Sequence, residues 1–109
     1  MWIYLNNSFL SVVRPSDIDA NGILMVRARI KRDIEQVFPG AEITNTPMRD
    51  YPYRAFIASK LVADAIADQI LGIEYSNFKQ STTDIHRHQV YRRVWSATQA
   101  LQDKEPHRL

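Results

Sequence analysis

Between residues 24 and 38 the pattern of apolar and polar positions changes its period. Over Leu24–Arg29 apolar and polar side chains alternate, which is the two-residue period of a half-buried strand. From Ile30 to Phe38 apolar residues recur at intervals of three and four, which predicts a short amphipathic helix that Pro39-Gly40 ends. The pattern therefore predicts a strand that passes directly into a helix, each with one apolar face.

Two shorter strand patterns precede this unit. Trp2–Leu5 and Phe9–Val13 are rich in apolar residues, and Asn6-Asn7-Ser8 separates them. Because asparagine tolerates positive φ, we expect a tight hairpin turn at this point. The polar stretch Pro15–Gly22 that follows is typical of a loop.

Two further strands and a helix are expected after the first helix. Ala41–Thr46 is a weaker strand pattern, and Tyr53–Ala58 is a stronger one. Ser59 is a favourable N-cap residue for the next helix, and Gly72 is a suitable residue to end it.

The chain is then expected to form a connector and a last helix. Residues 73–83 form the connector, Asp84 caps the helix, and the helix runs to about Gln102. The tail, residues 103–109, is charged and contains Pro106, so we expect it to be flexible. One side of the helix is expected to be mainly apolar: Tyr91, Val94, Trp95, Thr98 and Leu101.

This order of elements predicts an α+β fold. An N-terminal β-hairpin is followed by a β-α-β-β-α-α order, which favours a mainly antiparallel sheet with helices on one face, in the style of ferredoxin-like folds. We expect residues 1–102 to form a single domain.

Composition excludes several classes of site. The chain has 109 residues, of which 45% are hydrophobic, enough for one core without metal or disulfide support. It contains no cysteine, which excludes disulfides, thiol chemistry and cysteine-bound zinc. With no basic leader and no apolar run of about 18 residues, we expect a cytoplasmic protein that does not span a membrane.

Charge permits an anionic partner without requiring one. Fourteen Lys and Arg residues stand against twelve Asp and Glu residues, and ten of the fourteen are arginines. The net charge of +2 is a mild excess of this kind.

The stretch Asp17–Gly22 resembles the first half of a calcium-binding loop. Its oxygen-bearing side chains occupy alternate positions and a glycine follows them. The acid required at the twelfth position is Ala28 instead, and strand patterns flank the loop where helices are needed. Ordinary turn chemistry is the favoured interpretation, and we assign no metal.

A second candidate is an arginine surface on the predicted sheet. Arg27 and Arg29 share one face of their strand, and Arg54 joins them if the Tyr53–Ala58 strand lies nearby. Tyr51 and Tyr53 add aromatic rings. Guanidinium groups among aromatic rings on an open sheet bind phosphates and stack bases, as in proteins that bind single-stranded RNA.

The competing interpretation, which we favour, is a solvated face. The short aromatic motif that marks RRM-type proteins is absent from the sequence. In this interpretation the arginines pair with nearby acids, namely Glu42, Asp50 or Asp33.

The last helix carries a third candidate. His86 and His88 are two residues apart and so lie on different sides of a helix, which makes them poor joint metal ligands. We expect His88 to pack at the edge of the core, with a role as general acid or base as the alternative. Arg92 and Arg93 suit solvated charge or phosphate contacts.

Catalytic signatures are otherwise absent from the sequence. Three glycines cannot make a glycine-rich phosphate loop, and no nucleotide-binding or nucleophile-elbow motif occurs. Asp64 and Asp68 are one helical turn apart, but they are more simply the outer face of an amphipathic helix. We therefore expect no catalytic residue and no cofactor.

Several segments together resemble a family of small uncharacterised proteins from bacteria and from phages or plasmids. The resemblance covers most of residues 1 to 95 and implies a free-standing single-domain protein, carried on a mobile element. The family has no known activity, so it supplies no catalytic residues to transfer to this chain. The resemblance is carried by Met1–Val13, Leu24–Arg29, Val37–Gly40, Tyr53–Phe56, Asn77–Lys79 and the pair Tyr91 and Trp95.

Two classes of function remain. The preferred one is a non-enzymatic binding protein, whose partner is nucleic acid or another protein; a specific version is a phage-type, anti-CRISPR-like inhibitor of a host defence nuclease. Its candidate contact residues are Arg27, Arg29, Arg54, Arg92 and Arg93. The rival is a small metal-dependent nuclease using Asp17 and Asp19, or an enzyme using His88. A homodimer through an edge strand is also open.

Overall fold

The computed structural model describes residues 1–16 and 21–104. The chain divides into two compact units. We call Met1–Glu74 the sheet unit and Tyr75–Leu109 the helical unit. The elements of the sheet unit are β1 (Trp2–Leu5), β2 (Ser8–Val13), β3 (Ile23–Ala28), α1 (Lys31–Val37), β4 (Thr44–Asn45), β5 (Tyr53–Ala58) and α2 (Ser59–Leu71). Those of the helical unit are α3 (Phe78–Ser81) and α4 (Ile85–Lys104).

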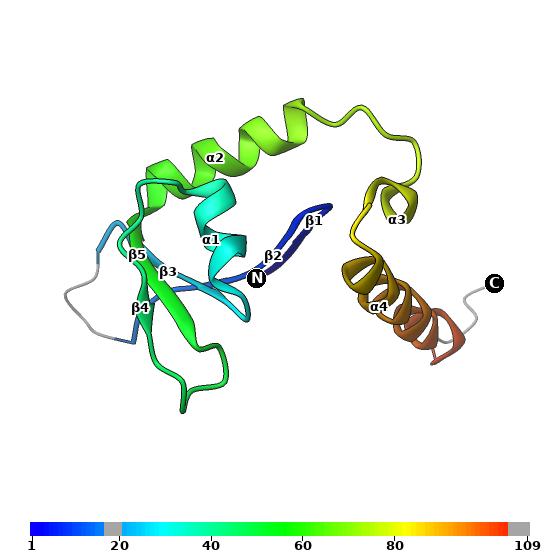
Figure 1. The fold of residues 1–109 in the computed structure, drawn as a ribbon, viewed down its shortest axis with the longest axis horizontal. Coiled ribbons are helices and arrows are strands. Elements are labelled where there is room, and N and C mark those ends of the chain that lie inside the picture. Colours follow the sequence, from blue (N-terminus) through cyan, green and yellow to red (C-terminus); the bar gives the residue numbers. More distant parts are fainter. Residues whose placement is uncertain (17–20, 105–109) are drawn as a thin grey trace. The chain divides into compact units, whose positions relative to one another are not determined.

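The five strands of the sheet unit form one antiparallel sheet in the order β1-β2-β3-β5-β4 (Figure 1). Strand β5 lies between β3 and β4, so α1 connects two parallel strands that are separated by an antiparallel one. This split β-α-β unit is the arrangement of ferredoxin-like folds. In ferredoxin-like folds a strand that follows the second helix lies beside the first strand of this unit; here β2 takes that position beside β3. The α+β prediction is confirmed.

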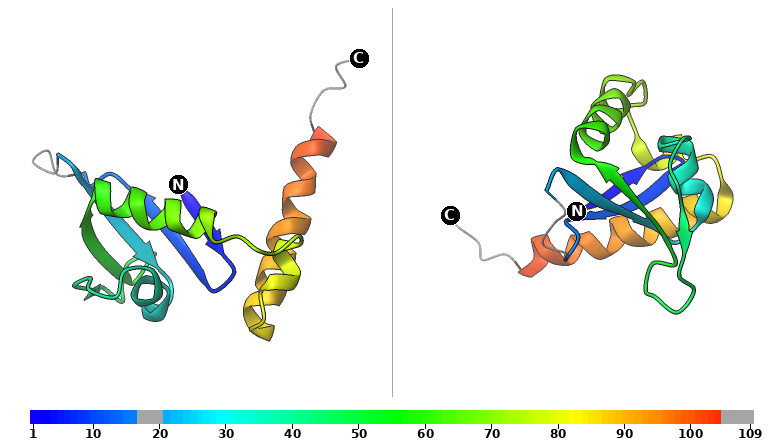
Figure 2. Two further views of the ribbon diagram at one scale, coloured as in Figure 1. Left: turned by 90° about the horizontal axis from the view of Figure 1, so that it is seen from above. Right: turned by 90° about the vertical axis from the view of Figure 1, so that its left-hand side faces the viewer.

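Helices α1 and α2 cover one face of this sheet (Figure 2). Side chains alternate between the two faces of each strand, so every second residue of β2, β3 and β5 points towards the helices. The buried core consists of Leu10, Val12, Val26, Ala28, Ile34, Phe38, Ala55, Ile57 and Val62. All of these lie in the sheet unit, which therefore contains a complete core.

Three details of the sheet unit differ from the sequence predictions. Ile30 is not part of the apolar stripe of α1: it is the extended N-cap residue and is 51% exposed. Ser59 is not an N-cap, because β5 continues directly into α2 and the Ser59 amide donates to the carbonyl of Gly22 at 2.8 Å. The Asn6-Asn7 turn forms without the positive φ that we expected, since no described residue other than glycine has one.

The predicted strand over Ala41–Thr46 is much shorter than expected. Only Thr44–Asn45, at the edge of the sheet, pairs with β5. The stronger prediction, Tyr53–Ala58, is confirmed with the same bounds.

The helical unit contains one more helix than predicted. The connector includes α3, whose first turn is capped by the Asn77 side chain, which accepts a hydrogen bond from the Gln80 amide at 3.1 Å. Asp84 caps α4 as expected, because its carboxylate accepts from the Arg87 amide at 2.8 Å. Helix α4 extends through residue 104, so the first two residues of the predicted tail are helical.

The helical unit buries little apolar surface. The Tyr91 ring is 4% exposed and stacks on Phe78, with 5.5 Å between ring centroids. On the predicted apolar side of α4, Trp95 and Leu101 are exposed. Helix α4 thus has one well-buried position on that side rather than a continuous apolar stripe.

No helix in residues 1–16 and 21–104 is both long enough and apolar enough to cross a membrane.

Candidate nucleic-acid interface

The face of the sheet opposite the core carries aromatic rings and arginines. Strand pairing aligns Trp2 with Ser11, Ser11 with Arg27, and Arg27 with Arg54, so these residues form one row across β1, β2, β3 and β5. A neighbouring row pairs Tyr4 with Phe9, and another pairs Met25 with Phe56. We call this surface the aromatic–arginine face: Trp2, Tyr4, Phe9, Ser11, Met25, Arg27, Arg29, Arg54 and Phe56.

Within the described part of the sheet unit, both α1 and α2 pack on the other face. Trp2 is 66% exposed and Phe56 is 62% exposed, which is unusual for large apolar side chains in strands. They lie on β1 and β5, three strand spacings or about 14 Å apart. Arg27 lies on β3 and Arg29 directly follows this strand, whereas Arg54 lies on β5 two residues before Phe56. Exposed rings and arginines therefore share this face.

Two ring contacts organise the β1–β2 end of the face. Tyr4 stacks on Phe9 with 4.5 Å between centroids, and Trp2 meets Phe9 edge-on at 6.4 Å. Burial, followed by repulsion from Tyr51, raises the pKa of Tyr4 above its usual 10.0. The three rings form a rigid aromatic patch beside the arginines.

The loop between β4 and β5 places Tyr51 on the arginines. The guanidinium carbons of Arg27 and Arg29 lie 4.6 Å and 4.4 Å from the centre of its ring, and Phe9 lies 6.4 Å from it. These contacts leave Tyr51 only 4% exposed. Cation–π attraction of this kind holds the guanidinium planes in fixed positions.

The three sheet arginines are held to different degrees. Arg27 donates from Nη2 to the Ser11 hydroxyl at 2.7 Å, and no acceptor among the described residues reaches its buried Nε. Arg54 donates to the Tyr51 carbonyl at 3.2 Å and approaches the sulfur of Met25 at 3.7 Å. Arg27 is thus mainly a scaffold, whereas Arg54 keeps hydrogen-bonding capacity.

Arg29 is the most accessible of the three. It donates from Nη1 to the carbonyl of Asp50 at 2.7 Å and contacts the carboxylate of the same residue at 3.3 Å. Its side chain is 54% exposed and that of Asp50 is 74% exposed. This pair confirms one of the three predicted acid partners.

Positive charge dominates the centre of the face. Desolvation, and then repulsion by Arg49 and Arg27, lower the pKa of Arg54 below its ordinary value, while Asp50 opposes this. Removing guanidinium groups from water beside one another is unfavourable unless an anion is close. Arg54 thus lies close to two other arginines and to Asp50, and this cluster of positive charge suits an anionic ligand.

Sequence reasoning found the arginines but missed most of the aromatic residues. It correctly placed Arg27 and Arg29 on one face, and the register brings Arg54 directly opposite Arg27. Tyr53 was assigned to this face wrongly, because it packs against the core on the other side. The signal that was missed is the strand period itself, which places Trp2, Tyr4, Phe9 and Phe56 with the arginines once the register is known.

Asp33, another of the predicted acid partners, contacts the N-terminal hairpin. It is 2% exposed, and its Oδ2 accepts a hydrogen bond from the Phe9 amide at 2.9 Å. Next to it on α1, Gln36 donates to the Asn7 carbonyl at 2.8 Å. These two side chains attach α1 to the N-terminal hairpin and are structural.

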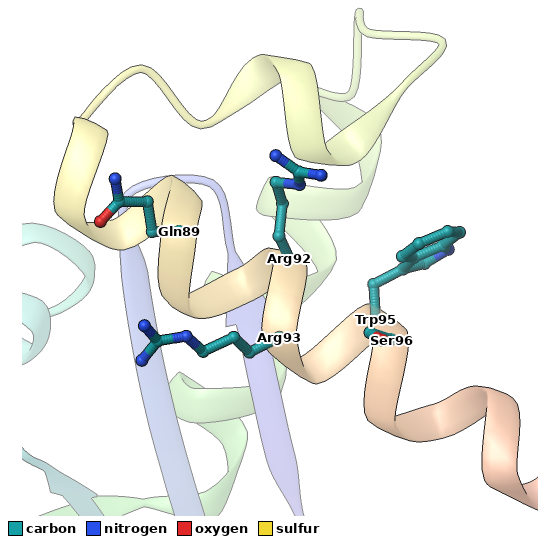
Figure 3. Close-up of a pocket in the computed structure, with 5 residues that line it drawn as sticks. All are labelled: Gln89, Arg92, Arg93, Trp95 and Ser96. Atoms are coloured by element: carbon teal, nitrogen blue, oxygen red, sulfur yellow. The ribbon is translucent and has the colours of Figure 1, made fainter.

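Arg92 and Arg93 lie in the helical unit, on α4. They leave the helix in different directions around a hollow of about 450 Å³ that Gln89, Trp95 and Ser96 also line (Figure 3). The two guanidinium groups therefore do not converge on one anion.

The remaining candidates from the sequence are His88 and several aspartates. His88 is half-buried, with Nδ1 at 2.7 Å from the Lys79 carbonyl, as expected of a packed histidine. Asp64 forms an exposed ion pair with Lys60 at 2.9 Å. Asp17 and Asp19 lie outside the described residues, and in residues 1–16 and 21–104 no group of three His, Asp or Glu side chains could hold a metal.

Comparison of the chain with family models, with curated proteins and with solved structures gave no match.

Proposed function

We propose that this protein is a non-enzymatic binding protein whose aromatic–arginine face binds single-stranded nucleic acid. The observation that carries the proposal is that the exposed rings of Trp2 and Phe56 share one sheet face with Arg27 and Arg54, on the side opposite α1 and α2. Unpaired bases stack on exposed aromatic rings, and guanidinium groups bind the phosphates between them.

A single strand fits this face better than a duplex. The aromatic surfaces lie about 14 Å apart on a sheet, a spacing that suits two or three splayed bases. In a duplex the bases are already stacked and paired, so they cannot use the rings. With so few contacts we expect a dissociation constant on the order of 10⁻⁵ M at physiological salt.

Fluorescence anisotropy of a labelled oligouridine and of a labelled DNA duplex tests the proposal. We expect tighter binding of the single strand, and an affinity that falls linearly with log salt concentration. Replacing Arg29 or Arg54 by Ala should weaken binding about three- to tenfold and make the salt slope shallower by about one. Arg32→Ala on α1 removes the same charge away from the face and is the control.

The proposal fails if the single strand does not bind at low salt, or if Arg32→Ala weakens binding as much as Arg29→Ala. The first result excludes nucleic acid as the partner. The second indicates a general charge effect and leaves the face without a specific role.

The other functions stay predictions. A nuclease depends on Asp17 and Asp19, which lie outside the described residues. An inhibitor of a host defence nuclease, and carriage on a mobile element, depend on the family resemblance and on no observed contact. A protein partner bound through α4 would use the exposed Trp95 and Leu101.

A further inference from the structure

The Arg29–Asp50 pair has the form of a ligand contact made within the chain. Asp50 presents a carboxylate to Arg29, and the adjoining Tyr51 presents an aromatic ring to Arg27 and Arg29. A nucleotide likewise presents an anion, its phosphate, together with an aromatic ring, its base. The loop thus meets the arginines with the same two chemical groups.

The two contacts differ in how readily they can be replaced. Tyr51 is buried beneath the arginines, and displacing it would expose a large apolar ring. The carboxylate of Asp50 is mostly exposed, and exposed ion pairs contribute little to stability. A competing phosphate can therefore take the place of Asp50 while Tyr51 stays where it is.

Resting on the function proposed above, we infer that Arg29 is the phosphate-binding position of the face, and that Asp50 occupies this position in the unbound protein. Tyr51 holds the guanidinium of Arg29 in place, and Arg54 and Arg49 contribute positive charge nearby. A backbone phosphate replaces the carboxylate of Asp50 when the strand binds. Asp50 thereby lowers the affinity of the face for every phosphate-containing ligand.

The test compares Asp50→Asn with Glu35→Gln in the full chain. Both substitutions raise the net charge by the same amount. Glu35 is exposed on α1, which packs on the side of the sheet opposite the aromatic–arginine face. With labelled oligouridine at low salt, we expect Asp50→Asn to bind about three- to fivefold more tightly than wild type, and Glu35→Gln to bind nearly as wild type does. The double variant Asp50→Asn/Arg29→Ala should lose this gain.

The outcomes separate the inference from the proposed function. If wild type binds and Asp50→Asn gains no more than Glu35→Gln, the inference is wrong and the proposed function stands. If the double variant keeps the gain, Arg29 is not the phosphate position. If no variant binds the oligonucleotide, the proposed function is excluded and the inference with it. Thermal unfolding of each variant verifies that it is folded.

Discussion

At the scale of single residues, the buried position of Asp33 and its contact with the hairpin are the features least predictable from the sequence pattern. Its position in α1 is that of an acid near the start of a helix, where it would ordinarily be solvated. Its burial depends on the hairpin, which is distant in sequence and presents the Phe9 amide to it at 2.9 Å. Patterns within a helix carry no information about such a partner.

Replacing Asp33 by Ala should lower the free energy of unfolding by about 1–3 kcal/mol, because the partner groups of a buried carboxylate lose their acceptor. Urea denaturation measures the change. Glu35→Ala, two residues further along α1 and exposed, should change stability by less than about 0.5 kcal/mol. Equal effects of the two substitutions would contradict the structural role of Asp33.

Tyr4 makes stability depend on pH at the alkaline end. Its pKa is raised in the folded protein, so above about pH 10 the unfolded chain loses this proton more readily than the folded one. The free energy of unfolding should therefore fall as the pH rises from 10 through the folded pKa. Tyr4→Phe should make this fall shallower in denaturation curves measured at several alkaline pH values, whereas an unchanged slope would show that Tyr4 does not contribute.

At the scale of elements, the sequence correctly predicted those helices and strands whose formation depends on neighbouring residues alone. The strand over Tyr53–Ala58 and the Asp84 cap follow from residues adjacent in sequence, and both are confirmed. The position of Tyr51 follows from a loop that folds back onto another strand, which no local period encodes. The arginines of the candidate site could therefore be predicted, but the ring that holds two of them could not.

The cap of α4 gives a prediction at this scale. Asp84→Ala should destabilise the first turn of α4 by about 1 kcal/mol, because the Arg87 amide loses its acceptor. Hydrogen exchange at that amide should become faster. Asp103→Ala in the last turn removes an acid near the negative end of the helix dipole, so it should leave this exchange unchanged; faster exchange in both variants would point to general loosening instead.

At the scale of the whole molecule, the two units differ in how much buried core each contains. Every member of the buried core lies before residue 75, whereas Tyr91 and Thr82 are the buried residues described after it. The sequence predicted a single domain over residues 1–102, because composition indicates how much apolar material exists but not where it is buried. That prediction stays untested by the structure.

We expect a fragment of residues 1–74 to unfold cooperatively in urea, and a fragment of residues 75–109 to be only partly helical in circular dichroism. Isolated helices without a packed core are marginal in water. An unfolded 1–74 fragment would show that the sheet unit requires the helical unit, in agreement with the single-domain prediction.

The central claim is that single-stranded nucleic acid stacks on the aromatic–arginine face, and the two tryptophans allow a direct test because they lie in different units. Trp95→Phe leaves Trp2 on β1 as the sole indole, and Trp2→Phe leaves Trp95 on α4. On titration with oligouridine, we predict saturable quenching of fluorescence in Trp95→Phe and an unchanged signal in Trp2→Phe. Quenching of Trp95 without quenching of Trp2 would place the strand on α4 and contradict the claim.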